Sequence, residues 1–282
     1  TLFPYTTLFR SMDYFKFSSI EYLILDEADR MLDMGFHEDI MQIVNGLEGK
    51  SQTLLFSATM PPKIRDLSRK LLNNPNEISI AMSKPAEGIL QAAYMVYDNQ
   101  KIPLIKSLLN GKDLSSVLIF SSTKLKVKEI HRSLRQAGFP AEAIHSDLEQ
   151  AEREAVMLNF RNRKTQILVA TDIIARGIDV EGIDLVINYD VPGDAEDYVH
   201  RVGRTARAKS TGVALTFINE NEMDKFGMIE KLIGSTVFKS PLPEGFEEGP
   251  VYNPDAPRAR RFYKKPGGPR NKGFKTRSGA KH

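Results

Sequence analysis

The stretch YLILDEAD, from Tyr22 to Asp29, sets four apolar residues directly before a group of acidic ones. A short apolar run of this kind predicts a buried β-strand, here over Glu21–Ala28, with acids at its C-terminal end. That end of a parallel strand is where α/β sheets bind ligands. The same letters are equally consistent with the first turn of a helix, where the helix dipole favours acidic side chains. The surrounding sequence has to decide between the two.

The residues that follow this stretch alternate between helical and extended patterns. Helices are predicted over Phe36–Leu47 and Lys63–Leu72, and strands over Gln52–Thr59 and Glu77–Ile80. Buried strands that alternate with helices favour a parallel sheet covered on both faces. Three strands are too few to complete such a sheet, so we expect an exposed apolar sheet edge that promotes association.

A second and complete α/β pattern follows a linker that contains Pro and Gly. Its predicted strands are Gln91–Tyr97, Ser116–Phe120, Glu142–Ile144, Gln166–Ala170, Leu185–Asn188 and Gly212–Phe217. Its predicted helices are Lys101–Leu109, Lys124–Ala137, Gln150–Asn162, Ala195–Val202 and Glu222–Ile233. About 150 residues is a common domain size, so we expect this part to fold by itself.

The end of the chain differs from the rest in composition and charge. Residues 254–282 contain ten Lys and Arg and one acidic residue, a net charge of +9, whereas the remaining residues carry −6. From Pro241 onward no apolar periodicity remains, which predicts a disordered segment. Phe262, Tyr263 and Phe274 stand among the basic residues. Aromatic rings can stack on unpaired bases while cations follow phosphates, so this tail favours nucleic acid as a partner.

The first eleven residues, TLFPYTTLFRS, match the in-frame translation of a widely used sequencing adapter. Their apolar residues and threonines would also suit a β-strand. We expect Thr1–Ser11 to be an assembly artefact and exclude it from the fold. The predicted organisation is an artefactual leader at 1–11, a partial first domain at 12–82, a linker at 83–90, a second domain at 91–240 and a basic disordered tail at 241–282.

The composition excludes several classes of protein. The chain contains no cysteine, which rules out disulfides and cysteine-based zinc sites and permits a reducing compartment. It contains no charge-free apolar run of about 18 residues, so no membrane span is predicted. It does not begin with a basic segment followed by an apolar one, which argues against a signal peptide. We expect a cytoplasmic protein, and the pattern gives no signal for an oligomeric state.

Four more motifs follow DEAD along the chain. They are SAT at Ser57–Thr59, LIFSSTK at Leu118–Lys124, ATDIIARGID at Ala170–Asp179 and HRVGRTAR at His200–Arg207. Together with DEADRMLDMGF, which begins at Asp26, they resemble the DEAD-box RNA helicases of superfamily 2, over about Ile20 to Phe238. Ser146 and Ala206 stand where many members of that family have Gly, and both keep the residue small.

The resemblance implies both a fold and an activity. The fold is α/β: the C-terminal part of a first RecA-like domain, then a complete second RecA-like parallel-sheet domain and a disordered basic tail. The activity is that of an ATP-dependent RNA helicase, which couples ATP binding and hydrolysis to local unwinding of RNA duplexes. ATP and Mg²⁺ would be its cofactors, and RNA would be its partner.

The resemblance also implies roles for residues around the nucleotide. Asp26 would hold Mg²⁺ through water, and Glu27 would be the catalytic base. Arg204 and Arg207, three apart on a predicted helix, would reach the γ-phosphate, because a planar permanent charge suits a transferring phosphoryl group. A surface ion-pair network is the alternative for these two arginines.

The remaining implied roles concern coupling and RNA. Asp29 would bridge to Ser57, Thr59 and His200, Asp179 would contact the ribose, and Arg176 and Gly177 would shape the contact between domains. The RNA contacts implied are Thr171, Ser121 to Thr123, Gln150 and Arg153. Phosphate contacts of this type position a strand without reading its sequence. Arg153 is also consistent with an ordinary solvated helix residue.

The chain contains no Walker A pattern, G-x-x-x-x-G-K-[ST], to cradle nucleotide phosphates. By the resemblance this loop precedes DEAD, where the chain has 25 residues. We therefore expect the chain alone to be inactive in ATP hydrolysis. One alternative is a non-catalytic RNA-binding module made of the second domain and tail. Another is a superfamily 2 DNA helicase, against which the DEAD, SAT and HRVGRTAR set argues.

Overall fold

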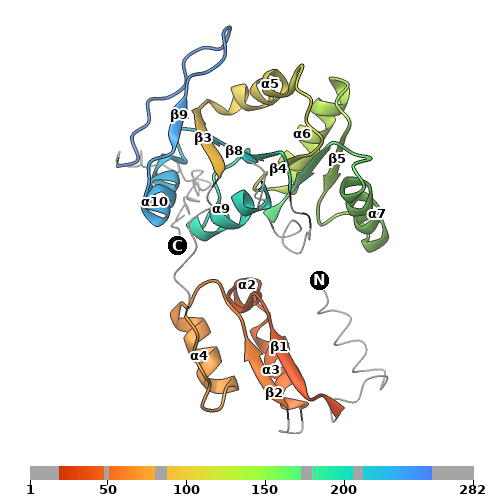
Figure 1. The fold of residues 1–282 in the computed structure, drawn as a ribbon, viewed down its shortest axis with the longest axis vertical. Coiled ribbons are helices and arrows are strands. Elements are labelled where there is room, and N and C mark those ends of the chain that lie inside the picture. The colour runs from red at the N-terminus through yellow and green to blue at the C-terminus, as the bar shows by residue number, and fades with distance from the viewer. Residues whose placement is uncertain are drawn as a thin grey trace, which may run out of the picture.

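The computed structural model describes residues 19–47, 51–79, 88–172, 180, 182–205 and 212–255 (Figure 1). They form two units: a small unit over residues 19–79 and a large unit over residues 88–255. Our predictions for residues 1–18, for Arg176, Gly177, Asp179 and Arg207, and for residues 256–282 lie outside the described residues. None of the helices in the described part is long and apolar enough to span a membrane.

The small unit is a two-stranded parallel sheet with helices on one face. Its elements are β1 (Tyr22–Leu25), α2 (Ala28–Asp33), α3 (His37–Asn45), β2 (Gln52–Leu55) and α4 (Pro62–Leu71). Leu25 of β1, Ile40 of α3 and Leu67 of α4 form the centre of its core and are almost fully buried. Successive strand residues point to opposite faces, so Leu23 and Leu25 face the helices and their neighbours do not.

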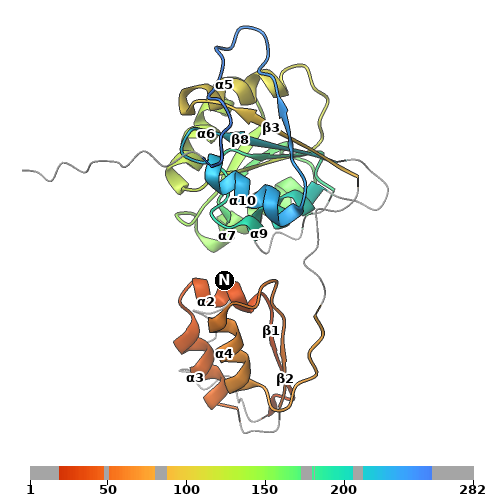
Figure 2. The same cartoon turned by 90° about the vertical axis from the view of Figure 1, so that its left-hand side faces the viewer.

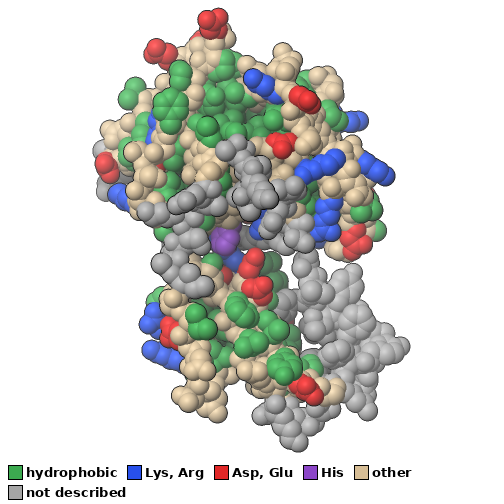
Figure 3. All heavy atoms as spheres, viewed as in Figure 1, with side chains coloured by type: hydrophobic (Ala, Val, Ile, Leu, Met, Phe, Trp, Pro, Cys, Tyr) green, Lys and Arg blue, Asp and Glu red, His purple; other side chains and the backbone are tan. Residues whose placement is uncertain are grey.

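The other face of this small sheet is exposed. Tyr22 is 60% exposed, Ile24 is 58% exposed, and Phe56 after β2 is 54% exposed. Figure 3 shows hydrophobic side chains at the surface of this unit. Our prediction of helices on both faces is therefore wrong for the described part of the small unit. The small unit does expose apolar side chains, as we expected, and they lie on a face of its sheet as well as at an edge.

The strand predicted at Glu77–Ile80 is also wrong over the residues that the structure describes. Glu77 to Ser79 are neither helix nor strand, and Ile80 lies outside the described residues. Within the described part, β2 pairs with β1, and no strand lies beyond it. A strand needs a neighbour to take its backbone hydrogen bonds, so an apolar pattern alone does not make one.

The large unit is built on a seven-stranded parallel sheet with the order β5-β6-β4-β7-β8-β3-β9. Its strands are β3 (Ile89–Met95), β4 (Val117–Phe120), β5 (Ala141–Ile144), β6 (Ile167–Ala170), β7 (Leu185–Asn188), β8 (Gly212–Ile218) and β9 (Phe238–Ser240). Its helices are α5 (Asp98–Leu109), α6 (Lys124–Gln136), α7 (Gln150–Arg161), α9 (Ala195–Val202) and α10 (Met223–Ile233). The complete α/β pattern predicted after the linker is present.

Helices cover both faces of this larger sheet (Figures 1 and 2). Helices α5 and α6 pack on one face, over residues such as Val117 and Ile119. Helices α7, α9 and α10 pack on the other face, over residues such as Leu118 and Ala214. This explains why strands such as β4, VLIF, are apolar at every position, since both sides of the strand are buried.

The predicted start of the disordered tail, at Pro241, is wrong. Strand β9 adds an edge to the sheet beside β3, and residues 241–255 then form a strap on the large unit. The Tyr252 hydroxyl donates to Glu230 at 2.6 Å, and its ring packs edge-on against Phe226. Gly249 lies so close to the Met95 carbonyl that a Cβ would overlap it. The strap lacks periodicity because it is held by contacts with separate elements, so no sequence pattern marks it.

Candidate functional site

The ends of β1 and β2 bring the DEAD and SAT motifs together. The Phe56 amide donates to the Leu25 carbonyl at 2.8 Å, and the Ala28 amide donates to the Phe56 carbonyl at 3.0 Å. Ala28 begins α2, and Asp29 lies in its first turn. The two interpretations of DEAD therefore both hold: Asp26 and Glu27 follow the strand, and Asp29 belongs to the helix.

Asp29 is held in place by the SAT segment. Its carboxylate accepts from the Thr59 amide at 2.9 Å and the Thr59 hydroxyl at 2.8 Å. The Asp29 amide donates to the Ser57 hydroxyl at 3.3 Å, and that hydroxyl donates to the Thr59 carbonyl. Burial alone would raise the pKa of Asp29, but the hydrogen bonds from Thr59 and Arg30 and the charge of Arg30 outweigh it and lower the pKa. Asp29 is thus a fixed anion.

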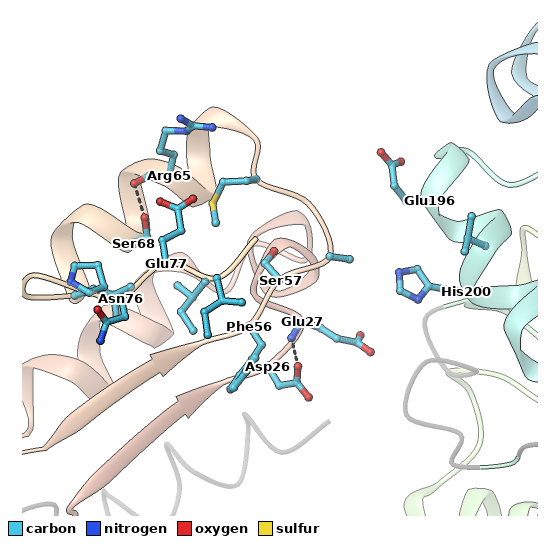
Figure 4. Close-up of a pocket in the computed structure, with 17 residues that line it drawn as sticks. Asp26, Glu27, Phe56, Ser57, Arg65, Ser68, Asn76, Glu77, Glu196 and His200 are labelled. Carbon is cyan, nitrogen blue, oxygen red and sulfur yellow. Dashed lines mark hydrogen bonds between the residues drawn. The ribbon is translucent and has the colours of Figure 1, made fainter. Parts of the chain in front are cut away.

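Glu27 adopts an unusual backbone conformation at the start of α2. Its φ of 49° and ψ of 45° are left-handed, and its amide donates to the Asp26 carboxylate at 2.9 Å. Residues that have a Cβ adopt the left-handed backbone conformation at a cost of about 1–2 kcal/mol. Strain of this kind is typical of functional positions. The turn directs the exposed Glu27 carboxylate toward the large unit (Figure 4).

We predict that Glu27→Gly stabilises the small unit by about 1 kcal/mol relative to Glu27→Ala, because Gly enters the left-handed region freely. Both variants remove the carboxylate, so their difference isolates the backbone strain. Hydrogen exchange of the β1 and β2 amides in the full chain measures it. An alanine variant as well protected as the glycine variant would show that no strain is stored at this position.

A cavity of about 630 Å³ lies at the junction of the two units. Asp26, Glu27 and Ser57 line it from the small unit, and Glu196 and His200 of α9 line it from the large unit. In Figure 4, His200 and Glu196 lie across the open space from Glu27. Apolar residues and α4 complete the wall on the small unit, among them Phe56 and Arg65. The cavity therefore has carboxylates of the small unit on one side and the exposed His200 imidazole of the large unit on the other.

Helix α9 is fixed in the large unit by Arg201, which is 3% exposed. Its guanidinium donates two hydrogen bonds to Asp172, at 2.6 and 2.7 Å, and others to the Asn188 side chain and the Asp190 carbonyl. Arg201 also lies over the Phe120 ring. Our sequence analysis assigned no role to Arg201 or Asp172. Their pairing depends on the fold, and no spacing rule in the sequence points to it.

The helix predicted over Ala195–Val202 is present as α9, but our expectation that Arg204 lies on a helix is wrong. Helix α9 ends at Val202, and Gly203–Thr205 form a 3₁₀ turn. The Arg204 carbonyl accepts from the Ile183 amide at 3.2 Å, which ties the turn to the segment before β7. Arg204 thus follows the helix that carries His200, and Arg207 lies outside the described residues.

The residues expected to contact RNA gather at the N-terminal ends of α6 and α7. Thr123 caps α6 by accepting from the Lys126 amide at 3.3 Å. Arg153 of α7 donates to the Leu148 and Ser146 carbonyls, and Gln150 is exposed at the start of α7. Thr171, after β6, is half-buried. These positions surround the turn between β5 and α7.

Two lysines of α6 also contact the turn between β5 and α7. Lys124 and Lys128 donate hydrogen bonds to Asp147 in that turn, and these bonds lower the pKa of Asp147 to about 2. Ser121 differs from our expectation, because its side chain is fully buried and its hydroxyl donates to Asp190 at 3.0 Å. In this conformation Ser121 supports the loop, and Thr123 and its exposed neighbours form the surface.

Two protein families match the sequence. Residues 3–67 match the family described as DEAD/DEAH box helicase, and residues 100–209 match the helicase conserved C-terminal domain. The first match begins inside the adapter-like stretch, whose origin stays a prediction.

Curated relatives agree with these matches. The ATP-dependent RNA helicase CshA of Limosilactobacillus reuteri is 42% identical over 218 residues, which cover 77% of this chain and 44% of the relative. The ATP-dependent RNA helicase DBP2 of Candida albicans is 46% identical over 220 residues, which cover 76% of this chain and 39% of the relative. The chain thus spans less than half the length of these relatives.

Solved structures show the same relationship. Dbp5 of Saccharomyces cerevisiae, bound to RNA and ADP BeF3, aligns with a TM-score of 0.75 at 28% identity, over 83% of this chain and 62% of that one. A DEAD box protein from the hyperthermophile Methanococcus jannaschii aligns with a TM-score of 0.53 at 40% identity, over 78% of this chain and 60% of that one. The two family matches, these relatives and the arrangement of DEAD and SAT opposite His200 of α9 show that the chain belongs to the DEAD-box family of helicases.

Proposed function

We propose that this chain carries part of the ATP-hydrolysing and RNA-gripping machinery of an ATP-dependent RNA helicase. The observation that supports this most directly is the cavity at the junction of the two units. It sets the Asp26 and Glu27 carboxylates opposite His200, and α9 leads from His200 into the turn that holds Arg204. A nucleotide bound there would contact both units, which is how its hydrolysis would change their relative position.

In this proposal each residue of the site has a separate role. Glu27 orients and deprotonates the attacking water, and Arg204, with Arg207, supports the charge on the γ-phosphate. Asp29 holds the SAT segment against α2. Asp179 would contact the ribose and Gly177 would shape the contact between domains, although both lie outside the described residues. Because Asp29 is a hydrogen-bonded anion, the coupling segment stays fixed while Glu27 remains free to act.

The residues at the mouth of the cavity fit Mg²⁺ bound together with a nucleotide. Asp26 is exposed, lines the cavity and accepts a hydrogen bond from the Glu27 amide. Among the described residues, no group of three or more His, Asp or Glu side chains is placed to bind a metal by itself. Mg²⁺ commonly binds through one or two carboxylates, waters and substrate phosphates, so Asp26 would hold it beside ATP and neutralise phosphate charge.

The chain alone is proposed to be inactive in ATP hydrolysis and able to bind RNA. Its sequence offers no Walker A loop to hold the phosphates, so the carboxylates and arginines have no bound nucleotide to act on. RNA binding would use the ends of α6 and α7, with Thr123, Gln150 and Arg153, and the basic tail. The relative Dbp5 is solved with RNA bound, which supports RNA as the partner. We further propose that the protein acts in the cytoplasm.

The alternative is that the large unit and tail form an RNA-binding module without any catalytic role. The arrangement of Asp26, Glu27 and His200 around one cavity favours the helicase, because a simple binding module has no need for it. The alternative gains support only if Glu27 and Arg204 prove irrelevant in a longer protein that hydrolyses ATP.

Filter binding of labelled single-stranded RNA tests the RNA part of the proposal. We expect the full chain to bind RNA of several sequences, with affinity that falls steeply as salt rises. A chain that ends at Asp255 keeps the strap and loses the basic tail, so it should bind more weakly and with a shallower salt dependence. Single-stranded DNA of the same sequences is the control for nucleic-acid type.

Phosphate release measured in the same reactions tests the catalytic part. We expect no RNA-stimulated release above background from the chain alone. Equal RNA affinity for the full and shortened chains would contradict the role of the tail, and RNA-stimulated release by the chain alone would contradict its inactivity.

A further inference from the structure

Arg30, the residue after DEAD, connects the two units. Its side chain is 13% exposed and hydrogen-bonds to Asp197 of α9, whose side chain is 7% exposed. The same guanidinium lies 3.7 Å from Asp194, the residue that precedes α9. Figure 1 shows α2 and α9 facing each other between the units. The sequence separates Arg30 from Asp197 by 167 positions, so only the fold brings them together.

The two ends of this contact are the elements that carry the candidate catalytic groups. Arg30 lies in α2, three residues after Glu27 and next to Asp29. Asp197 lies in the first turn of α9, three residues before His200. A contact between these two short helices therefore constrains the distance between the Glu27 and His200 sides of the cavity.

The Arg30 guanidinium is well suited to connect the two units. A guanidinium is planar and always charged, and its several N–H groups can bind two carboxylates at once. Asp194 and Asp197 supply two carboxylates from the large unit, and Asp33, at 3.7 Å, supplies one from Arg30's own helix. Because Arg30 and Asp197 are largely shielded from solvent, their attraction is screened less than that of an exposed pair.

We propose that Arg30 is a positioning residue that holds α2 against α9 and thereby sets the opening of the cavity between Glu27 and His200. The consequence for catalysis rests on the proposed function, whereas the link between the units does not. Breaking the contact lets the units separate, and the carboxylates then lose their place opposite α9.

Fluorescence energy transfer between the units of the full chain tests this proposal without nucleotide or RNA. The chain contains no cysteine, so Asn45→Cys and Lys112→Cys, both at exposed positions, place one dye on each unit. We expect Arg30→Ala and Asp197→Asn each to lower the transfer efficiency. The charge exchange of Arg30→Asp with Asp197→Arg should recover at least half of the loss seen in Arg30→Asp alone.

Arg69→Ala is the matched control. Arg69 forms an ion pair with Asp66 on α4, where both side chains are largely exposed, and it should leave the transfer efficiency unchanged. Circular dichroism checks that each variant keeps its helices, and if Arg30→Ala does not, Asp197→Asn and the charge exchange decide. Transfer efficiency equal to that of the unmodified chain in Asp197→Asn, or no recovery in the exchanged pair, overturns the proposal. If the variants change the transfer efficiency as expected but the chain does not bind RNA, the proposed function is contradicted and the role of Arg30 is not.

Discussion

Replacing Arg201 with alanine is expected to destabilise the large unit by about 3–5 kcal/mol. The substitution removes a buried guanidinium that satisfies the Asp172 carboxylate, the Asn188 side-chain oxygen and the Asp190 carbonyl. Asn188 and Asp190 would remain buried without the hydrogen bonds from Arg201, the partly exposed Asp172 would lose its ion pair, and the Phe120 ring would lose the cation above it. Unpaired buried polar groups carry their full desolvation cost, which is why the effect is large.

Hydrogen exchange of the β7 amides in the full chain measures this loss, because β7 lies at the centre of the sheet and its Asn188 binds Arg201. Arg201→Lys keeps the charge and loses the planar fork, so it should recover only part of the protection. Arg132→Ala, at an exposed position of α6, is the control and should change little. Wild-type protection in Arg201→Ala would show that the network does not stabilise the sheet.

Replacing Lys101 with methionine is expected to cost about 3–5 kcal/mol near neutral pH. The Lys101 side chain is fully buried, and its ammonium lies 3.1 Å from Glu222, 3.2 Å from Asp98 and 3.7 Å from Asp190. Methionine fills a similar volume without charge, so the substitution chiefly leaves the buried Asp190 and Glu222 with less positive charge nearby. Lys126, at 2.6 Å from Asp190, remains and limits the damage on that side.

The cost should depend on pH in a defined direction. Burial raises the pKa of Glu222, and Lys101 opposes that rise, so removal of Lys101 raises the pKa further. A raised pKa means that the neutral carboxyl stabilises the folded state at low pH, and this stability is lost as pH rises through the folded-state pKa. The difference between wild type and Lys101→Met should therefore be smaller at about pH 5 than at about pH 7.

Asp190 behaves in the opposite way and serves as an internal check. Burial alone would raise its pKa, but the hydrogen bonds from Lys126 and Ser122 and the charge of Lys101 lower it to about 2. Its contribution is present above the ordinary value of 3.8 and is lost between that value and about 2, so it does not change between about pH 5 and about pH 7. Hydrogen exchange at the two pH values, with Lys112→Met as an exposed control, measures the comparison. If Lys101→Met lost the same stability at both pH values, Glu222 would not be the group that the substitution leaves unpaired.

Local patterns were sufficient for most of the helices and strands. The runs VLIF and ILVA predicted buried parallel strands, and they form β4 and β6, which lie side by side in the sheet, with β4 next to the central strand β7. Leu185–Asn188 and Ala195–Val202 have the predicted bounds. The prediction of a strand at Glu77–Ile80 was wrong, because an apolar pattern states what a residue can do and not whether a neighbouring strand is there to pair with it.

The α/β class, the order of the motifs and the residue types at the site follow from local patterns, because apolar periodicity and short motifs involve residues that are close in the chain. Which charges meet depends instead on the packed fold. Arg201 finds Asp172 across 29 positions, Lys101 finds Glu222 across 121, and Arg30 finds Asp197 across 167. Such pairs depend on how the elements pack, because the sequence around a charged residue does not indicate which distant residue it will contact. The same reason explains the strap, whose Tyr252 and Gly249 have no periodic pattern and are held by surfaces that exist only after the large unit has folded.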